Sequence, residues 1–110
     1  MQRFDEKLPI ESVVLTFDFS NALDAGEILL GSPVITFSTL YGGDVNPSAL
    51  ANGPVQIDLT QTMVLVPIIG GLDENDYVIV AECSTSNAKK QLAWAGILPV
   101  RQYPSQTSNC

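Results

Sequence analysis

Acidic side chains supply most of the groups in this sequence that could do chemistry. The chain of 110 residues has 12 Asp and Glu, 5 Lys and Arg, and no His. The absence of His removes the Ser-His-Asp and Cys-His systems of nucleophilic catalysis and the usual imidazole ligands of metal sites. Carboxylates therefore remain as the main candidates for general acid–base catalysis or for binding a hard cation.

Two groupings of acidic residues bear on catalysis. Asp73, Glu74 and Asp76 lie in one short polar run that could gather a calcium ion, but the run lacks the ligand spacing of an EF-hand loop. Asp18 and Asp58 lie on the polar sides of two expected strands, and they would form a glycosidase-like pair only if those strands were neighbours. Turn geometry and sheet solubility explain both groupings with fewer assumptions. We therefore expect no metal ion, no cofactor and no catalytic residue, and a carboxylate enzyme is the least favoured alternative.

The cysteines and the glycine pairs indicate no further site. Cys83 lies inside an expected strand and Cys110 is the last residue, so they lack the close spacing of a zinc site and are poor disulfide partners. We expect both thiols to be free. The pairs 42–43 and 70–71 precede neither Lys-Ser/Thr nor an expected helix, which predicts turns and not phosphate-binding loops.

The net charge of −7 disfavours two classes of partner. Nucleic acid and anionic membrane surfaces both repel an acidic protein, and the few cations are scattered along the chain. The longest apolar run, residues 63–71, contains Pro67 and is far shorter than a membrane-spanning helix. The mixed charge of the N-terminus does not resemble a secretory signal. We expect a protein made in the cytoplasm that binds neither nucleic acid nor membrane.

Apolar and polar residues alternate through most of the chain, which predicts β-strands. The segments with this pattern, or with a more apolar version of it, are residues 12–19, 28–30, 33–41, 55–59, 62–69, 77–83 and 91–100. Between them we expect a turn or one short helical turn at 20–27 with Leu23 as a plug, the longest loop at 42–54, and a polar hairpin loop at 84–90. Pro67 predicts an edge strand or a bulge, and Pro99 is expected to end the sheet.

This series of short strands without a long helix predicts an all-β fold, specifically an immunoglobulin-like antiparallel β-sandwich of about six to eight short strands. A small barrel is the main alternative. The only Trp, Trp94, is expected to fill the core, with a surface anchor as the alternative.

The sandwich is expected to span residues 12–100, with an N-terminal arm at 1–11 and a C-terminal tail at 101–110. Such ends are commonly frayed, and alternatively they become ordered on neighbouring subunits. The side chains that we expect to make such contacts are Gln2, Arg3, Phe4, Leu8, Ile10, Arg101, Tyr103 and Pro104.

Several short motifs together resemble a family of small structural proteins of tailed bacteriophages. The motifs are Leu15-Thr16-Phe17-Asp18-Phe19-Ser20, Leu23 with Ala25-Gly26-Glu27, Pro47-Ser48, Tyr77, Thr85-Ser86 and Leu98-Pro99-Val100. They occur in the family's order across residues 12–100, and their order and spacing carry the resemblance. Asn87-Ala88 departs from the family's Gly after Thr-Ser, but Asn adopts the left-handed conformation at modest cost.

The resemblance implies an immunoglobulin-like domain that acts in the virion as a non-enzymatic adaptor, joining tail or head-tail components to fibres. The implied partners are other virion proteins, namely tail, portal or head-tail connector, and fibre, with multiple copies around the particle axis. The alternative is a carbohydrate-binding or adhesive β-sandwich module. In that case Tyr41, Tyr77, Trp94 and Tyr103 would supply the rings that stack on sugars.

Overall fold

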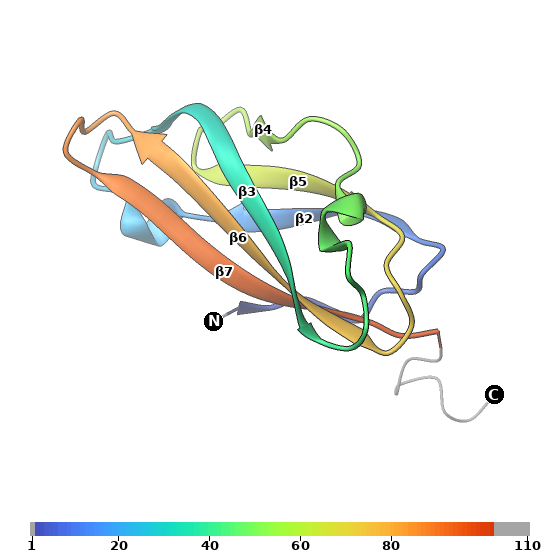
Figure 1. Ribbon diagram of the computed structural model, residues 1–110. Coiled ribbons are helices and arrows are strands. Elements are labelled where there is room, and N and C mark those ends of the chain that lie inside the picture. The colour runs from blue at the N-terminus through green and yellow to red at the C-terminus, as the bar shows by residue number, and fades with distance from the viewer. Residues whose placement is uncertain (1, 103–110) are drawn as a thin grey trace.

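The computed structural model describes residues 2–102, which form two layers of strands (Figure 1). The strands are β1 (Gln2–Arg3), β2 (Ser12–Asp18), β3 (Leu29–Tyr41), β4 (Gln56–Ile57), β5 (Met63–Ile69), β6 (Asn75–Thr85) and β7 (Gln91–Val100). Two short 3₁₀ helices, η1 (Ser20–Ala22) and η2 (Pro47–Leu50), lie in the connections. The predicted all-β class is confirmed. Within the described residues, no helix is long and apolar enough to cross a membrane.

The strands are divided between a larger sheet of order β1-β7-β6-β3 and a smaller sheet of order β2-β5-β4. Every pair of strands is antiparallel except β1 and β7, which are parallel. The chain therefore changes layer after each of β1, β2 and β3 and again between β5 and β6 (Figure 1).

The core lies between the layers and receives every second side chain of the main strands. On β2, Leu15 and Phe17 are buried while Val14 and Thr16 are exposed, so the predicted alternation is confirmed. The buried apolar residues are Leu15, Phe17, Phe19, Leu29, Leu50, Val64, Val66, Ile68, Tyr77, Ile79, Ala81, Cys83, Leu98 and Val100. Burying one large apolar side chain contributes roughly 1.5–3 kcal/mol, so this cluster is the main source of stability.

The central strand β6 is covered on one face and half-covered on the other, as its apolar sequence predicts. It pairs with β7 from Asn75↔Val100 to Ser84↔Gln91, which confirms the predicted polar hairpin loop between these strands. On its other side β6 pairs with β3, which joins the two predicted segments 28–30 and 33–41 into one strand with a register shift between Leu30 and Val34.

The predicted strand at 55–59 is wrong beyond residue 57, because a turn begins at Asp58. The Asp58 N–H donates to the Met63 carbonyl, and Asp58 Oδ1 accepts hydrogen bonds from the N–H groups of Thr62 and Met63. Gln61 has a φ of 58°, which reverses the chain. Leu59, the last residue of the predicted strand, therefore lies in this turn and is fully exposed.

Pro67 and Pro99 do not limit their strands as expected. β5 is the central strand of its sheet and its register with β2 is unbroken, and β7 continues past Pro99 to Val100. The carbonyl groups of Pro67 and Pro99 accept hydrogen bonds from Asn52 and Lys7, away from the ladders with β2 and β6. Because the nitrogen and oxygen of one strand residue point to the same side, the missing N–H groups remove no bond from those ladders.

Candidate interaction surfaces

The acidic run after β5 does not form a single site. Asp73 Oδ1 accepts a hydrogen bond from the Gln102 N–H, whereas Asp76 Oδ1 pairs with Arg101 Nη2 at 2.8 Å. Among residues 2–102, no group of three or more His, Cys, Asp or Glu side chains is placed to hold a metal ion. These carboxylates instead fix the end of β7 against the start of β6.

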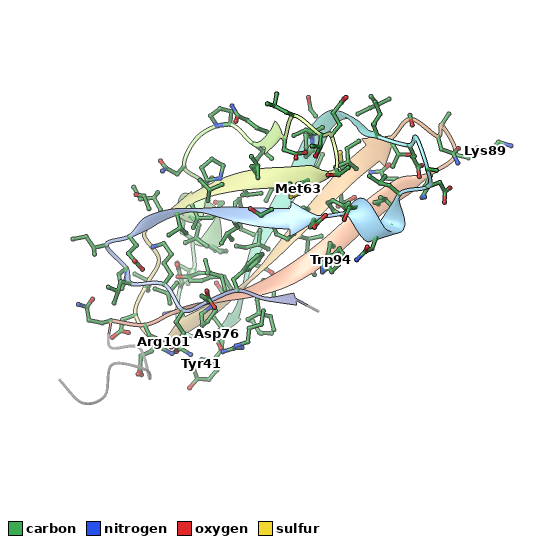
Figure 2. The ribbon with its side chains drawn as sticks, turned by 180° about the vertical axis from the view of Figure 1, so that it is seen from behind. Tyr41, Met63, Asp76, Lys89, Trp94 and Arg101 are labelled. Carbon is green, nitrogen blue, oxygen red and sulfur yellow. The ribbon has the colours of Figure 1, made fainter. Side chains whose placement is uncertain are left out.

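Asp18 and Asp58 lie on opposite sides of β5 and do not face each other. Asp18 is in register with Met63 on β2, and the Asp58 N–H donates to the Met63 carbonyl from the other side (Met63 is labelled in Figure 2). Two interstrand steps of about 4.8 Å place their backbones about 10 Å apart. The Thr60 hydroxyl donates to Asp58 and holds the pKa of Asp58 below its ordinary value, as expected for a carboxylate that organises a turn.

The N-terminal segment, expected to be an arm outside the domain, lies along β7. β1 pairs in parallel with Gly96 and Ile97, and the N–H groups of Phe4 and Lys7 donate to carbonyl groups further along β7. The expected boundary between residues 11 and 12 therefore does not separate this segment from the folded unit.

Phe4 is partly buried and packs against the core of its own domain. Its ring meets the Phe17 ring edge to face, with centroids 5.3 Å apart. A Cβ atom at Gly96 would overlap Phe4 Cε2, so the glycine makes room for the ring. The ring thus packs within its own chain, and the expected contact of Phe4 with a neighbouring subunit stays a prediction for its exposed part. A glycine within an expected strand was the sequence signal for such a close approach.

Lys7 is a buried cation that the sequence reading did not single out. Only 2% of its surface is exposed, and its Nζ donates to the carbonyl groups of Leu8 and Gly70, the second at 2.6 Å. Burial lowers the pKa of Lys7, an effect that the charge of Glu11 opposes. Lys7 thus ties the N-terminal segment to the connection between β5 and β6.

The other predicted N-terminal contacts remain accessible to different extents. Arg3 is exposed on β1, Leu8 is half-buried, and Ile10 is 88% exposed in a turn closed by a bond from the Glu11 N–H to the Leu8 carbonyl. Gln2 contributes its backbone to β1. Ile10 and Arg3 are therefore the N-terminal side chains best placed to contact another protein.

Arg101 is the one predicted C-terminal contact within the described residues. It is half-buried and pairs with Asp76, which is in register with Tyr41; all three residues lie at one end of the molecule (Figure 2). Tyr103 and Pro104 lie outside the described residues, so their contacts stay predictions.

The outer side of the larger sheet carries a face that is largely apolar. This outer face consists of Val34, Thr36 and Ser38 of β3, Val78, Val80 and Glu82 of β6, and Ala93, Ala95 and Ile97 of β7, so that Glu82 is its one charged side chain. A sheet with one face in water normally presents polar side chains there. The sequence indicated a doubly apolar strand at β6, but only the register between three strands brings these residues together.

The Trp94 side chain lies at a side of the two layers that no strand covers among the described residues, and the core does not enclose it. The indole is 36% exposed and meets the Phe19 ring edge to face, with centroids 6.0 Å apart (Figure 2). β1 pairs with β7 only at Gly96 and Ile97, so it does not extend past Trp94. The expectation of a core Trp is therefore corrected to a half-open ring that covers Phe19.

A polar cluster fixes the opposite end of the molecule. Glu27 accepts hydrogen bonds from Lys90 Nζ at 2.8 Å and from the Thr85 hydroxyl at 2.7 Å. The bond from Lys90 is the main reason that the pKa of Glu27 is lowered to about 2, and the same bond raises the pKa of Lys90. This cluster joins the segment before β3 to the β6–β7 hairpin.

No protein-family model, curated protein or solved structure matches this chain significantly. The resemblance to virion proteins that the short motifs indicate therefore stays a prediction. Any function must be argued from the surfaces described above.

Proposed function

We propose that this protein is a non-enzymatic structural protein of a bacteriophage virion, an adaptor that joins tail or head-tail components to fibres. The observation that carries the proposal is the apolar outer face of β3, β6 and β7. Contiguous exposed apolar surface marks interaction sites in soluble proteins. On a chain of net charge −7, a face on which Glu82 is the one charged side chain fits a domain that other virion subunits cover.

The finer fold that we propose is an immunoglobulin-like β-sandwich. In that fold strands B, E and D are neighbours in one sheet, and strands C, F and G in the other. The orders β2-β5-β4 and β3-β6-β7 correspond to B-E-D and C-F-G. This correspondence supports the proposal because it holds for both sheets.

Tyr77 supports the same fold. It lies near the start of β6, the strand equivalent to F, and its Oη accepts a hydrogen bond from the N–H of Leu72 in the preceding connection. Immunoglobulin-like domains carry a tyrosine corner at this place, in which the hydroxyl bonds to backbone a few residues upstream. Binding through faces, edges and terminal segments requires no cluster of catalytic groups, which agrees with the dispersed carboxylates described above.

Charge insertion on the outer face tests the proposal in the phage that encodes the protein. Val80→Glu and Val34→Glu place a carboxylate on the face, and Val45→Glu makes the same change at a loop residue that is 97% exposed. We expect Val45→Glu to be incorporated into purified particles normally and the two face variants to be lost from them. Thermal unfolding of each purified variant shows whether it folds, and Val34, at an edge strand and 58% exposed, is the safer position. Normal incorporation of folded Val34→Glu would overturn the proposal.

The placement of the aromatic rings does not favour carbohydrate binding. Tyr77 is fully buried, and Tyr41 is in register with Asp76, which pairs with Pro99. Trp94 lies five residues before Pro99 on β7, or about 17 Å along the strand. The described rings therefore form no shared platform, and we expect a glycan array to give no specific binding.

A further inference from the structure

One edge of the smaller sheet has no strand beside it among residues 2–102. The order β2-β5-β4 gives β2 a single neighbour, and all 7 of its residues pair with β5 in unbroken register. The Phe19 N–H donates to the Thr62 carbonyl, toward β5. Backbone groups alternate in direction along a strand, so those of Phe17 also point to β5, and those of Val14 and Thr16 point away from it.

The edge of β2 is the longest unbroken one that the described strands offer. β1 and β4 have 2 residues each. β3, the edge of the larger sheet, has register shifts and lies against η2 and β4. Natural edges are commonly guarded by Lys, Pro or a bulge. β2 has none of these, and its only charged residue is Asp18 at its end.

A groove of about 410 Å³ runs beside this edge, where the N-terminal segment passes β2 without pairing with it. Its apolar lining comes from Phe4, Val13, Val14, Leu15 and Leu98, and its charged lining from Asp5, Glu6, Lys7 and Glu11. A strand added to β2 would place alternate side chains toward this groove, because successive side chains point to opposite faces.

The charge around the edge is negative. Asp5 and Glu11 line the groove and Asp18 lies at the far end of β2. The one cation in the lining, Lys7, is turned inward, and its Nζ donates to two backbone carbonyl groups. Complementary charge selects partners and speeds their association, so a basic segment fits this edge and an acidic one is repelled.

We propose that the free edge of β2 is a strand-addition site for an extended cationic segment of another protein, in which basic residues alternate with apolar ones. The N–H and C=O groups of Val14 and Thr16 bond to the added strand, and the groove receives its apolar side chains. The inference deepens the proposed adaptor function, and it rests on that function for the claim that another virion protein supplies the segment.

A binding measurement on the isolated, full-length protein tests the edge directly. The probe is the capped peptide Lys-Val-Lys-Thr-Lys-Val-Lys, and the matched control has Glu in place of each Lys. We expect the lysine peptide to slow hydrogen exchange at the amides of Val14 and Thr16 but not at Phe17, whose N–H points to β5. Raising NaCl from about 50 mM to about 500 mM should weaken binding roughly tenfold, because salt screens exposed charges. Unchanged amides with several millimolar lysine peptide, or equal binding of the glutamate peptide, would overturn the proposal.

Two substitutions at one position distinguish the contribution of the backbone to peptide binding from that of the side chain. Val14→Pro removes an outward N–H without removing a bond to β5, whereas Val14→Ala keeps the N–H and shortens the side chain. We expect Val14→Ala to bind the lysine peptide within about threefold of the unsubstituted chain, and Val14→Pro to lose at least tenfold in affinity. Unchanged affinity of a folded Val14→Pro variant for the lysine peptide would contradict strand addition. If this variant does not fold, the hydrogen exchange of the Val14 and Thr16 amides in the unsubstituted chain tests the proposal instead.

The two proposals fail separately. Unchanged hydrogen exchange at Val14 and Thr16 in the presence of the lysine peptide, together with loss of Val34→Glu from particles, would remove strand addition and leave the adaptor function standing. Slower exchange at Val14 and Thr16 together with normal incorporation of Val34→Glu would remove the adaptor function and leave strand addition standing.

Discussion

The Tyr77 hydroxyl donates a hydrogen bond to Asp44 Oδ2 at 2.5 Å, which joins the start of β6 to the loop that follows β3. The same Tyr77 oxygen accepts a bond from the Leu72 N–H, in the connection between β5 and β6. Tyr77 is fully buried, so its ring belongs to the core while its hydroxyl organises two surface segments. One side chain thus couples the packing of the layers to the loops at one end of the molecule.

Tyr77→Phe should destabilise the fold. The substitution keeps the ring but leaves the Leu72 N–H and the Asp44 carboxylate without their buried partner, which costs about 1–3 kcal/mol. Urea unfolding measures the loss in the free energy of unfolding. Tyr41→Phe is the matched control, because Tyr41 is 65% exposed, and it should change that free energy by less than about 0.5 kcal/mol. Equal effects of the two substitutions would contradict a structural role for the Tyr77 hydroxyl.

Tyr77 should also make stability fall at alkaline pH. Burial, followed by the bond to Asp44, raises the pKa of Tyr77 to about 12. Since the folded pKa lies above the unfolded value near 10, the contribution is complete below pH 10 and is lost as the pH rises toward 12. Urea unfolding at several pH values should show the stability gap between the unsubstituted chain and Tyr77→Phe narrowing over this window. A constant gap would show that the phenol is not held protonated.

Glu27 should make the opposite contribution at acid pH. The hydrogen bond from Lys90 lowers the pKa of Glu27 to about 2, so the stabilisation is complete above about pH 4.5 and is lost as the pH falls toward 2. Glu27→Gln should therefore be less stable than the unsubstituted chain at pH 6, and the difference should shrink as the pH approaches 2. Denaturant unfolding over this range measures it. The exposed residue Glu74 provides the control substitution Glu74→Gln, and the same pH-dependent difference in that variant would contradict the assignment to Glu27.

Gly96→Ala should loosen the N-terminal segment. The new Cβ would overlap the Phe4 ring, so the ring must leave its place against Phe17. Hydrogen exchange should accelerate at the Phe4 and Lys7 amides, which bond to β7, and change little at the center of β6. Gly43→Ala is the control, because nothing lies within 4 Å of a Cβ there. Unchanged exchange at Phe4 in Gly96→Ala would show that the ring position does not hold the segment.

Sequence reasoning succeeded where a structure is determined locally. The alternation in β2 and β6 specifies which face is buried, because a slip of one residue would reverse every side chain. The predictions were wrong where residues far apart in the sequence determine the structure. Phe4 and Lys7 are placed by β7 and by Gly70, and Asp58 ends β4 through bonds to β5.

The same reasoning explains which interaction surfaces could be predicted. Ile10 and Arg3 are exposed as expected because chain ends and turns tend to lie at the surface. The outer face requires the register of Thr36 with Val80 and of Val80 with Ala95, and the groove requires β2 to lie beside a segment that does not pair with it. No local pattern encodes either relationship.

The Cys83 thiol should be unreactive toward thiol reagents in the folded protein. It is a free thiol, 1% exposed, whose Sγ lies 3.5 Å from the Leu30 carbonyl oxygen, and burial raises its pKa. The thiolate is the reactive form, so both low access and the raised pKa oppose modification. Cys110 lies outside the described residues, and Cys110→Ser leaves Cys83 as the single thiol. In this variant we expect a thiol-reactive disulfide reagent to modify Cys83 only at the rate of unfolding, and urea to accelerate the reaction. Rapid modification without urea would show that the β3–β6 end of the core opens in the native state.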